Sequence, residues 1–344
     1  MLIRLRKRTT AAERDSIQSL CNELGLRSRF LDDAREMLEL EGDTSAQVRS
    51  RFEDCSGVQA ILEASDAPEA FAKTAERVGT TVRIGPAEFG GGVASVIAGP
   101  CAVEDGDRLL EIARAVQNAG ALALRGGAFK PRTSPYSFQG AGTDALGHLA
   151  RARAETGLGV VTELLDVRHL EAVAEVADAF QIGSRSMSNF ALLKEVGQTQ
   201  TPVLLKRGMA ATLREFLLAA EYVLAGGNPH VILCERGIRS FDSVTRNVLD
   251  VGGVAYLKQT THLPVIVDPS HAAGRSDLVP ALARAGLAAG ADGLLVEVHP
   301  NPSEAHSDGA QAISARTLAE VVRDARTILE MDGRRLATPQ PELT

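Results

Sequence analysis

The stretch TPVLLKRGMAATLREFLLAAEYVLAGGNPHVILCERG, residues 201–237, decides the fold. Two short apolar runs, PVLLKRG (202–208) and HVILCERG (230–237), flank a segment with the amphipathic pattern of a helix. Continuous apolar strands that are joined by a helix become neighbouring parallel strands with helices packed outside them. The stretch therefore predicts one strand–helix–strand unit of an α/β protein.

The same rhythm of apolar strand, polar turn and amphipathic helix repeats from Val93 towards the end of the chain. The predicted strands are SVIAGP (95–100), ALALRGG (121–127), GVVTEL (159–164), AFQIG (179–183), PVLLKRG, HVILCERG, PVIVDPSH (264–271) and GLLVEVHP (293–300). Eight such units predict a (β/α)8 barrel, the TIM barrel. A doubly wound open sheet is the alternative, but the glycine fingerprint G-x-G-x-x-G expected after its first strand is missing.

Residues 2–64 show a different order of strands and helices, βαββαβ, which predicts a small ferredoxin-like sandwich. Its first helix starts with a capping box of Thr10 and Glu13, Gly25 is a left-handed stop, and a second helix begins at about Asp43. We therefore expect three segments: a ferredoxin-like domain at 1–66, the barrel at 67–335 and a C-terminal tail at 336–344.

Two features are expected where the domains join. A helical connector is predicted from Pro68 onward. The run IGPAEFGGG (84–92) lacks the spacing of a phosphate-binding loop and predicts a turn or hairpin at the domain edge.

The composition narrows the classes of function. With 37 Lys and Arg against 44 Asp and Glu, the net charge of −7 argues against a nucleic-acid or anionic-membrane partner. No apolar run approaches membrane-spanning length and MLIRLRKRTT lacks the features of a secretory signal, so we expect a cytoplasmic protein. Four cysteines, Cys21, Cys55, Cys101 and Cys234, show no paired spacing, which indicates neither a disulfide framework nor a zinc ribbon.

The ends of the predicted strands carry the chemistry, because the active site of a TIM barrel is built at the carboxyl ends of its strands. Charged or reactive residues close nearly every strand: Cys101, Arg125 and Lys130, Glu163, Arg185, Lys206 and Arg207, Glu235 and Arg236, Asp268 and His271, and Glu297 and His299. Polar barrel rims explain one or two charges per loop but not this excess. The pattern predicts one active site at that end.

A first group of these residues offers mixed metal ligands: the thiol of Cys101, the imidazole of His271 and the carboxylates of Glu297 and Asp308. Taken singly, a barrel cysteine is more often a core residue and a histidine is more often satisfied structurally. Together they suit Mn²⁺, Fe²⁺, Co²⁺ or Zn²⁺ better than Mg²⁺, which avoids sulfur. The donor set does not choose among these four ions.

A second group predicts the binding of anions. The loop RGGAFKPRTSPYSFQG (125–140) is stiffened by prolines and holds three cations, although a lone K-P-R run can also be a solvated loop. The whole cationic set is Arg125, Lys130, Arg132, Arg185, Lys206 and Arg236. It is large enough for two phosphates, or for a phosphate and a carboxylate, so we expect two anionic substrates.

The residues quoted so far resemble a known family. IAGPCAVE, RGGAFKPRTSPYSFQG, QIGSRSMSNF, LLKRG, VILCERG, THLPVIVDPSHAAGR and GADGLLVEVHP resemble 3-deoxy-D-arabino-heptulosonate 7-phosphate (DAHP) synthase of the type I beta subgroup, in the family's order. The amino-terminal unit resembles the ferredoxin-like regulatory domain of some members. The resemblance implies a metal-dependent condensation of phosphoenolpyruvate with erythrose 4-phosphate, the first step of the shikimate pathway to aromatic amino acids.

By this resemblance the site residues acquire roles. The metal ligands would be Cys101, His271, Glu297 and Asp308; the phosphoenolpyruvate contacts Arg125, Lys130, Arg185, Lys206 and Arg236; and the sugar-phosphate contacts Arg132 and Thr133. Glu163 and Ser184 are further expected substrate contacts. Lys130 would donate a proton to the forming alkoxide, and Asp268 would orient His271 or the attacking water.

The resemblance also implies partners, and a few residues of this chain depart from the family's sequence pattern. An aromatic amino acid such as tyrosine or phenylalanine would be the effector of the amino-terminal domain, and the chain would form a homo-oligomer, a tetramer. Ser184 and Ser186 stand where members often have alanine and asparagine, and Gly252, Gly253 and Ala255 replace a common Ser-Ala-Val-Pro run. These changes leave the oligomeric state open.

Three alternatives remain. The sister synthase makes 3-deoxy-D-manno-octulosonate 8-phosphate from arabinose 5-phosphate, but it carries a K-A-N-R-S type run where this chain has KPRT (130–133). A Schiff-base aldolase using Lys206 would be indifferent to chelators. An amino-acid-binding regulatory protein with a silent barrel is disfavoured by the intact metal-ligand set.

Overall fold

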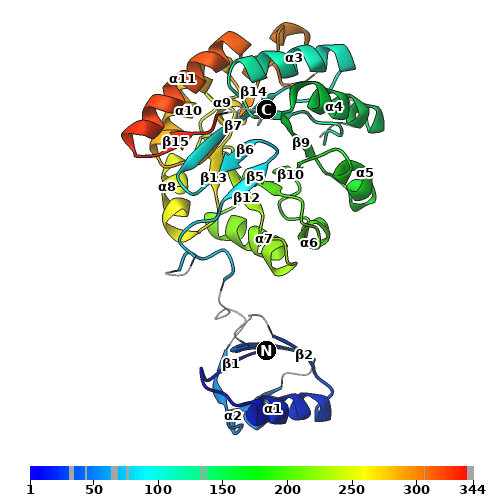
Figure 1. The fold of residues 1–344 in the computed structure, drawn as a ribbon, viewed down its shortest axis with the longest axis vertical. Coiled ribbons are helices and arrows are strands. Elements are labelled where there is room, and N and C mark those ends of the chain that lie inside the picture. The colour runs from blue at the N-terminus through cyan, green and yellow to red at the C-terminus, as the bar shows by residue number, and fades with distance from the viewer. Residues whose placement is uncertain are drawn as a thin grey trace, which may run out of the picture. The chain divides into compact units, whose positions relative to one another are not determined.

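The chain folds into two compact units, Met1–Glu69 and Ala70–Thr344. The computed structural model in Figure 1 describes residues 1–30, 35–42, 45–62, 69–74, 77–131, 134, 136, 138–305 and 307–338. Each unit has a hydrophobic core of its own, which is the property expected of a domain. Within these described ranges, no helix is long and apolar enough to cross a membrane.

The first unit is a small antiparallel sheet with two helices. Its described elements are β1 (Leu2–Leu5), α1 (Ala11–Glu23), β2 (Arg27–Phe30), β3 (Met37–Glu41), α2 (Ala46–Glu53) and β4 (Val58–Leu62). The strand order is β2-β3-β1-β4, and each neighbouring pair is antiparallel. Alternate strand residues such as Ile3 and Leu38 pack with Ile17 and Phe52 of the helices. The predicted βαββαβ order is confirmed.

The first helix begins as the sequence predicts. Thr10 N donates to Glu13 Oε2 at 2.8 Å and Glu13 N donates to Thr10 Oγ1 at 3.3 Å, which is a capping box. Ser56 Oγ donates to the other carboxylate oxygen of Glu13 at 2.6 Å and so ties α1 to the segment before β4. Gly25 has a φ of 65°, as expected of a left-handed stop. The second helix begins at Ala46, and its predicted start at Asp43 lies outside the described residues.

We predict that Glu13→Gln destabilises the first unit at neutral pH but not in acid. The hydrogen bond from Ser56, together with those from Thr10, lowers the pKa of Glu13 from 4.5 to about 2. A carboxyl group whose pKa is lowered by folding stabilises the fold above its unfolded pKa and loses that contribution as the pH falls towards the folded pKa. Amide hydrogen exchange of α1 should therefore be faster in the variant at pH 7, and the difference should vanish near pH 2.

Asp15→Asn is the matched control, because Asp15 is an exposed carboxylate of the same helix. The control should exchange like the wild type at both pH values. An equal effect of Glu13→Gln at pH 7 and near pH 2 would show that the carboxylate charge is not what stabilises the helix.

In the second unit, the described residues form eight parallel strands that close into a barrel. They are β7 (Val93–Gly99), β8 (Ala123–Arg125), β9 (Gly159–Glu163), β10 (Ala179–Ile182), β11 (Val203–Lys206), β12 (Val231–Glu235), β13 (Val265–Val267) and β14 (Gly293–Glu297). Consecutive strands pair in parallel, and β14 pairs with β7 from Gly293 opposite Ser95 to Glu297 opposite Gly99. This last pairing closes the ring and confirms the predicted (β/α)8 barrel.

Helices surround the strands, as Figure 1 shows. They are α3 (Gly106–Asn118), α4 (Thr143–Thr156), α5 (Leu170–Ala174), α6 (Phe190–Gly197), α7 (Leu213–Ala225), α8 (Val251–Thr260), α10 (Val279–Ala288) and α11 (Ala315–Met331). Each long helix buries one apolar stripe against the sheet; in α11 the stripe includes Leu318, Val322 and Leu329. A short helix, α9 (Pro269–Ala273), follows β13 directly.

The predicted hairpin fills the amino-terminal end of the barrel. It consists of β5 (Val82–Ile84) and β6 (Ala87–Phe89), which pair antiparallel. Ile84 and Phe89 are buried in a second core together with inward-facing barrel residues. Gly293 at the start of β14 leaves room for the hairpin, since a Cβ there would lie 2.9 Å from the ring of Phe89. The barrel is therefore packed shut at this end.

The prediction of a helical connector from Pro68 onward is wrong for the residues of this segment that the structure describes. The described residues 69–74 and 77–81 contain no helix. Phe71 is instead buried, and the backbone N–H groups of Ala70 and Phe71 donate to the carboxylate of Glu221 at 2.9 and 3.1 Å. Burial of one aromatic ring and satisfaction of two amides hold this segment along the barrel in place of a helix.

The end of the barrel extends further than expected. Leu336 and Ala337, which we placed in the tail at 336–344, are buried. Strand β15 (Arg335–Leu336) pairs in parallel with the start of β7, and Ala337 N donates to Ala94 O at 2.8 Å. The end of α11 is thereby anchored to the first barrel strand.

One of the departures from the family pattern has a local explanation. Asp250 caps α8, and Gly253 N donates to its Oδ1 at 2.7 Å. A Cβ at Gly253 would lie 2.4 Å from the other carboxylate oxygen and would displace it. A Cβ at Gly252 would have no neighbour closer than 3.8 Å, and nothing in the structure explains the glycine at this position.

Candidate active site

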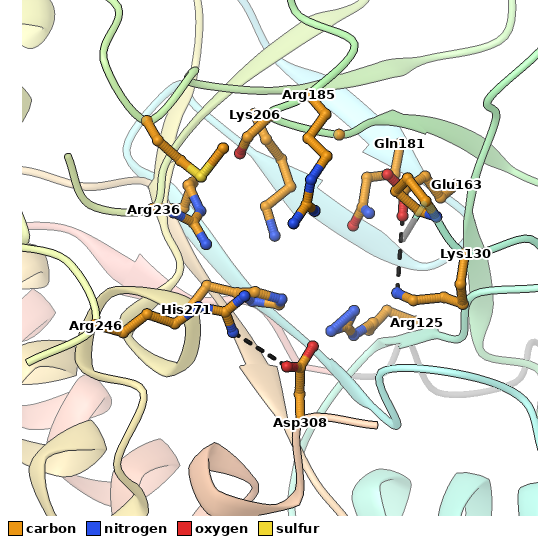
Figure 2. Close-up of a pocket in the computed structure, with 14 residues that line it drawn as sticks. Arg125, Lys130, Glu163, Gln181, Arg185, Lys206, Arg236, Arg246, His271 and Asp308 are labelled. Atoms are coloured by element: carbon orange, nitrogen blue, oxygen red, sulfur yellow. Dashed lines mark hydrogen bonds and ion pairs between the residues drawn. The ribbon is translucent and has the colours of Figure 1, made fainter. Parts of the chain in front are cut away.

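A pocket lies at the carboxyl ends of the barrel strands. It has a volume of about 620 Å³, including space open to solvent. Its described lining is Arg125, Lys130, Pro131, Glu163, Gln181, Gly183, Ser184, Arg185, Lys206, Met209, Arg236, Arg246, His271 and Asp308. Figure 2 shows that the cationic side chains among them point into the same space from several strands. The structure thus brings together most of the residues that the sequence singled out.

The site residues continue the inward-facing rows of the barrel. Side chains of a strand alternate between its two faces, so every second residue of a barrel strand faces the axis. The interior residues Ala123, Val161, Leu204, Cys234, Ile266 and Leu295 are followed two positions later by Arg125, Glu163, Lys206, Arg236, Asp268 and Glu297. The barrel therefore delivers six charged groups to one place by the alternation alone.

The same alternation turns Arg207 and Glu235 away from the pocket. Arg207 Nη1 lies 2.9 Å from Glu235 Oε2 and 2.8 Å from Asp250 Oδ2, in a buried network behind the strands. These residues end predicted strands, but they link β11, β12 and the cap of α8 rather than lining the pocket.

Four potential metal ligands converge at one side of the site. Cys101, His271, Glu297 and Asp308 each present one ligand atom, and these atoms all lie within 4.8 Å of one another. Cys101 Sγ donates to Asp308 Oδ2 at 3.1 Å, and His271 Nε2 lies 3.2 Å from Glu297 Oε1. A thiol, an imidazole and two carboxylates at this spacing fit a divalent transition metal ion.

His271 is held in orientation by Asp268. Asp268 caps α9, where its Oδ1 accepts the backbone N–H of His271 at 2.9 Å, and its Oδ2 lies 2.7 Å from His271 Nδ1. Burial lowers the pKa of His271, although Asp268 opposes this shift, and a lowered pKa favours the neutral form that a metal ligand must have. Nε2 is left facing Glu297, in the carboxylate–histidine arrangement typical of metal sites.

Asp268 also connects the metal-ligand cluster with the cationic side chains of the pocket. Its Oδ2 forms a buried ion pair with Lys206, whose side chain reaches into the pocket. Burial alone would raise the pKa of Asp268, but His271 and Lys206 hold it well below its usual range. Asp268 therefore stays ionised while it orients His271 and Lys206.

The surroundings of the buried Cys101 thiol favour its protonated form. Burial, followed by the neighbouring Glu297, raises the pKa of Cys101 to about 11. Glu297 itself is ion-paired with Arg125, and both side chains are buried. Burial tends to raise the pKa of Glu297, yet His271 and Arg125 bring it below its usual value. The cluster thus holds ionised carboxylates next to a thiol that can give up its proton when a metal binds.

Lys130 lies between the ligand cluster and Glu163. Its Nζ donates to Cys101 O at 2.9 Å and lies 3.8 Å from Glu163 Oε2, a contact drawn in Figure 2. Burial lowers the pKa of Lys130, but Cys101 and Glu163 outweigh it and raise the pKa above its usual value, so the amine is charged. Gly183 makes room for Glu163, because a Cβ there would lie 1.9 Å from Glu163 Oε1.

The opposite side of the pocket carries cationic side chains that could bind an anion. Arg236 is only 4% exposed, and its Nη1 is buried without a hydrogen-bond partner among the described residues. Ser184 and Arg185 follow β10 at the same wall, and the Arg185 side chain points towards the centre in Figure 2. A buried guanidinium with an unsatisfied N–H carries a desolvation penalty that an oxyanion would remove.

Five of the described lining residues were not among the predicted site residues: Pro131, Gln181, Gly183, Met209 and Arg246. Gln181 could have been found, because it lies two residues after the interior Ala179 on β10. Met209 and Arg246 lie in loops after β11 and β12, where no strand pattern marks them. Arg132 and Thr133, the expected sugar-phosphate contacts, lie outside the described residues.

Comparison with known proteins identifies the family. The sequence model of the DAHP synthetase I family matches residues 74–332. The chain belongs to this family. Phospho-2-dehydro-3-deoxyheptonate aldolase of Thermotoga maritima is 43% identical to it over 299 residues, which cover 87% of this chain and 88% of that protein. The resemblance found in the sequence is confirmed.

A more distant relative and two solved structures are also similar to this chain. The 2-dehydro-3-deoxyphosphooctonate aldolase of Rhodopseudomonas palustris is 33% identical over 271 residues, covering 73% of this chain and 93% of that protein. A crystal structure of the Thermotoga maritima DAHP synthase has a TM-score of 0.76 and 39% identity, covering 97% of this chain and 98% of that one. A truncated form from the same organism has a TM-score of 0.72 and 42% identity, covering 77% and 98%.

We predict that Arg236→Met weakens anion binding. Loss of a hydrogen bond to a charged group costs about 1.5 to 3 kcal/mol, which corresponds to a roughly 10- to 100-fold weaker affinity. Titration calorimetry with inorganic phosphate measures this change directly. Arg239→Met is the matched control, since Arg239 is an exposed arginine of the same loop, and it should bind phosphate like the wild type. If the two variants bound phosphate with equal affinity, Arg236 would not be a contact of the anion.

Proposed function

We propose that this chain condenses phosphoenolpyruvate with erythrose 4-phosphate and water to give DAHP and inorganic phosphate. The observation that carries the proposal is that the unsatisfied Arg236 shares a pocket with His271 and Asp308, two of the four side chains of the metal-ligand cluster. One substrate of this reaction carries a phosphate and a carboxylate, and the other carries a phosphate and an aldehyde. A cationic wall facing a metal-ligand cluster suits this pair.

The cations hold phosphoenolpyruvate. Arg236, Arg185 and Lys206 reach into the pocket from three consecutive strand ends and offer several N–H donors to its phosphate and carboxylate. Arg125 adds a fourth cation on the side of the ligand cluster. We assign Glu163 and Ser184 as further contacts, and Arg132 and Thr133 as contacts of the sugar phosphate. Fixing both anions in place converts a bimolecular encounter into a nearly unimolecular step.

The condensation requires one proton at a defined atom. Carbon 3 of phosphoenolpyruvate forms a bond to the aldehyde carbon, whose oxygen gains negative charge and takes a proton. Lys130 is the proposed donor, because its charged amine is buried between Cys101 O and Glu163. Water then adds to carbon 2 of the former phosphoenolpyruvate, and the bond between that carbon and the phosphate oxygen breaks, which releases inorganic phosphate.

Cys101, His271, Glu297 and Asp308 are the proposed ligands of a divalent metal ion. When bound, the ion would supply Lewis-acid polarisation of the aldehyde carbonyl. Asp268 keeps the His271 tautomer with Nε2 free for ligation, and so acts on the reaction through His271. Mn²⁺, Fe²⁺, Co²⁺ and Zn²⁺ all suit this mixed donor set, and availability in the cell would decide among them.

Two alternatives are weaker. Relatives named 2-dehydro-3-deoxyphosphooctonate aldolase match with lower identity and over less of the chain, and KPRT departs from the run of that sister family. Lys206 is ion-paired with buried Asp268, which disfavours its use as the free amine that a Schiff base requires.

The deciding test follows the loss of phosphoenolpyruvate with erythrose 4-phosphate and, in parallel, with arabinose 5-phosphate. We expect turnover of the four-carbon sugar, its loss after treatment with a chelator, and its recovery when Mn²⁺ or Co²⁺ is added back. Turnover of only the five-carbon sugar would assign the chain to the sister reaction. Turnover that survives complete metal removal would contradict the proposed ligand cluster.

We further propose that the first unit is a regulatory domain for an aromatic amino acid and that the chain assembles as a tetramer in the cytoplasm. The support is the family resemblance and the separate core of Met1–Glu69. Assembly would also remove exposed apolar side chains of α6 and α7, such as Phe190, Leu218 and Tyr222, from water.

Deletion of residues 1–66 tests the regulatory role. The shortened chain should keep its turnover and lose inhibition by tyrosine or phenylalanine, both measured with the assay above. Inhibition that persists after the deletion would place the effector site in the barrel. Light scattering of the full chain should give four times the 36.4 kDa of one chain; a monomer mass would contradict the proposed assembly.

A further inference from the structure

Arg246 makes contacts at the edge of the pocket that the catalytic scheme does not use. It lies in the loop between β12 and α8, and its Nη1 donates to Asp308 Oδ1 at 3.1 Å and to Gln311 Oε1 at 3.0 Å. Figure 2 shows its side chain reaching towards Asp308 from the side opposite Lys130. A cation thus spans two residues of the loop that follows β14.

Gln311 carries this connection to a second carboxylate. It is 2% exposed, and its Nε2 donates to Glu297 Oε2 at 2.7 Å while its Oε1 accepts from Arg246. Both ends of the buried amide are therefore satisfied, and the order of donors fixes its orientation. The result is a continuous chain of hydrogen bonds that runs from Glu297 through Gln311 and Arg246 to Asp308.

The other oxygen of each carboxylate lies at the ligand cluster, and that of Glu297 is also ion-paired with Arg125. Glu297 Oε1 lies 3.2 Å from His271 Nε2, and Asp308 Oδ2 lies 3.1 Å from Cys101 Sγ. The series of hydrogen bonds thus holds one oxygen of each carboxylate, and the other oxygen lies next to His271 in the case of Glu297 and next to Cys101 in the case of Asp308.

The loop that carries Arg246 is fixed to the helix that carries His271. Arg246 N donates to Ala273 O at 3.0 Å, and Asn247 Nδ2 donates to His271 O at 3.0 Å. Gly274, with a φ of 67°, permits this packing, because a Cβ there would lie 2.5 Å from Arg246 Cβ. The hydrogen-bond chain is therefore built on the same backbone as a third ligand.

We propose that Arg246 and Gln311 are positioning residues that hold Glu297 and Asp308 in place for the metal ion. This inference rests on the metal site of the proposed function. Asp308 belongs to a loop and has a φ of 54°, so no regular element holds its carboxylate. Arg246 supplies that support and a positive charge beside a ligand set with three anionic groups.

The test measures metal affinity without turnover. Co²⁺ is titrated into metal-free protein in competition with a chromogenic chelator, and its visible absorption reports the ligand geometry. Arg246→Met and Gln311→Met should each bind Co²⁺ about 10- to 100-fold more weakly than the wild type, with an altered spectrum. The Co²⁺ affinity of the double variant should fall by less than the product of the two single-variant factors, because both residues act through the same series of hydrogen bonds. Arg246→Lys should recover part of the affinity.

Arg239→Met serves as the control, because it removes an exposed arginine from the same loop and should leave the Co²⁺ affinity unchanged. Gln311 is buried, so circular dichroism of the metal-free variants checks folding; if Gln311→Met fails to fold, the part-exposed Arg246 carries the test alone. Co²⁺ affinities of the Arg246 variants within twofold of the wild type would overturn the proposal. So would a rise in KM for the sugar phosphate with unchanged Co²⁺ affinity, since Arg246 would then be a substrate contact.

The outcome separates this inference from the proposed function. A wild-type chain that binds Co²⁺ but does not turn over phosphoenolpyruvate would refute the reaction and leave the positioning role intact. A wild-type chain that does not bind Co²⁺ would refute the metal site and the positioning role together.

Discussion

The pairing of β14 with β7 is the constraint on which the rest of the second unit depends. Once the sheet closes, each strand has one face towards the helices and one towards the axis. Every strand side chain therefore points either to the helices or to the barrel interior. The interior rows are apolar along the strands and become charged at their carboxyl ends. Closure therefore determines both where the core lies and which residues meet in the pocket.

Burying so many charges in one place requires that they compensate one another. Arg125 is paired with Glu297, Lys206 with Asp268, and Lys130 lies near Glu163. Each pair holds its members in a fixed geometry in the absence of substrate, which is the preorganisation that a reaction between two anions requires. Arg236 differs, since its unsatisfied N–H leaves a place for an incoming oxyanion.

The sequence predicted the barrel, its eight strands and most of the pocket, because these follow from local periodicity and from the rule that barrel sites lie at strand ends. The alternation of side chains, applied strictly, would also have separated Arg236 from Arg207 and found Gln181. The role of Arg246 could not be predicted, because it depends on contacts between loops far apart in the sequence. The helical connector failed for a similar reason, since burial of Phe71 and the carboxylate of Glu221 override local helix propensity.

The hairpin of β5 and β6 has a consequence for kinetics. Its side chains fill the amino-terminal end of the barrel, so the site communicates with solvent through the opposite mouth. For a reaction with two substrates, both substrates and both products therefore pass through the same mouth.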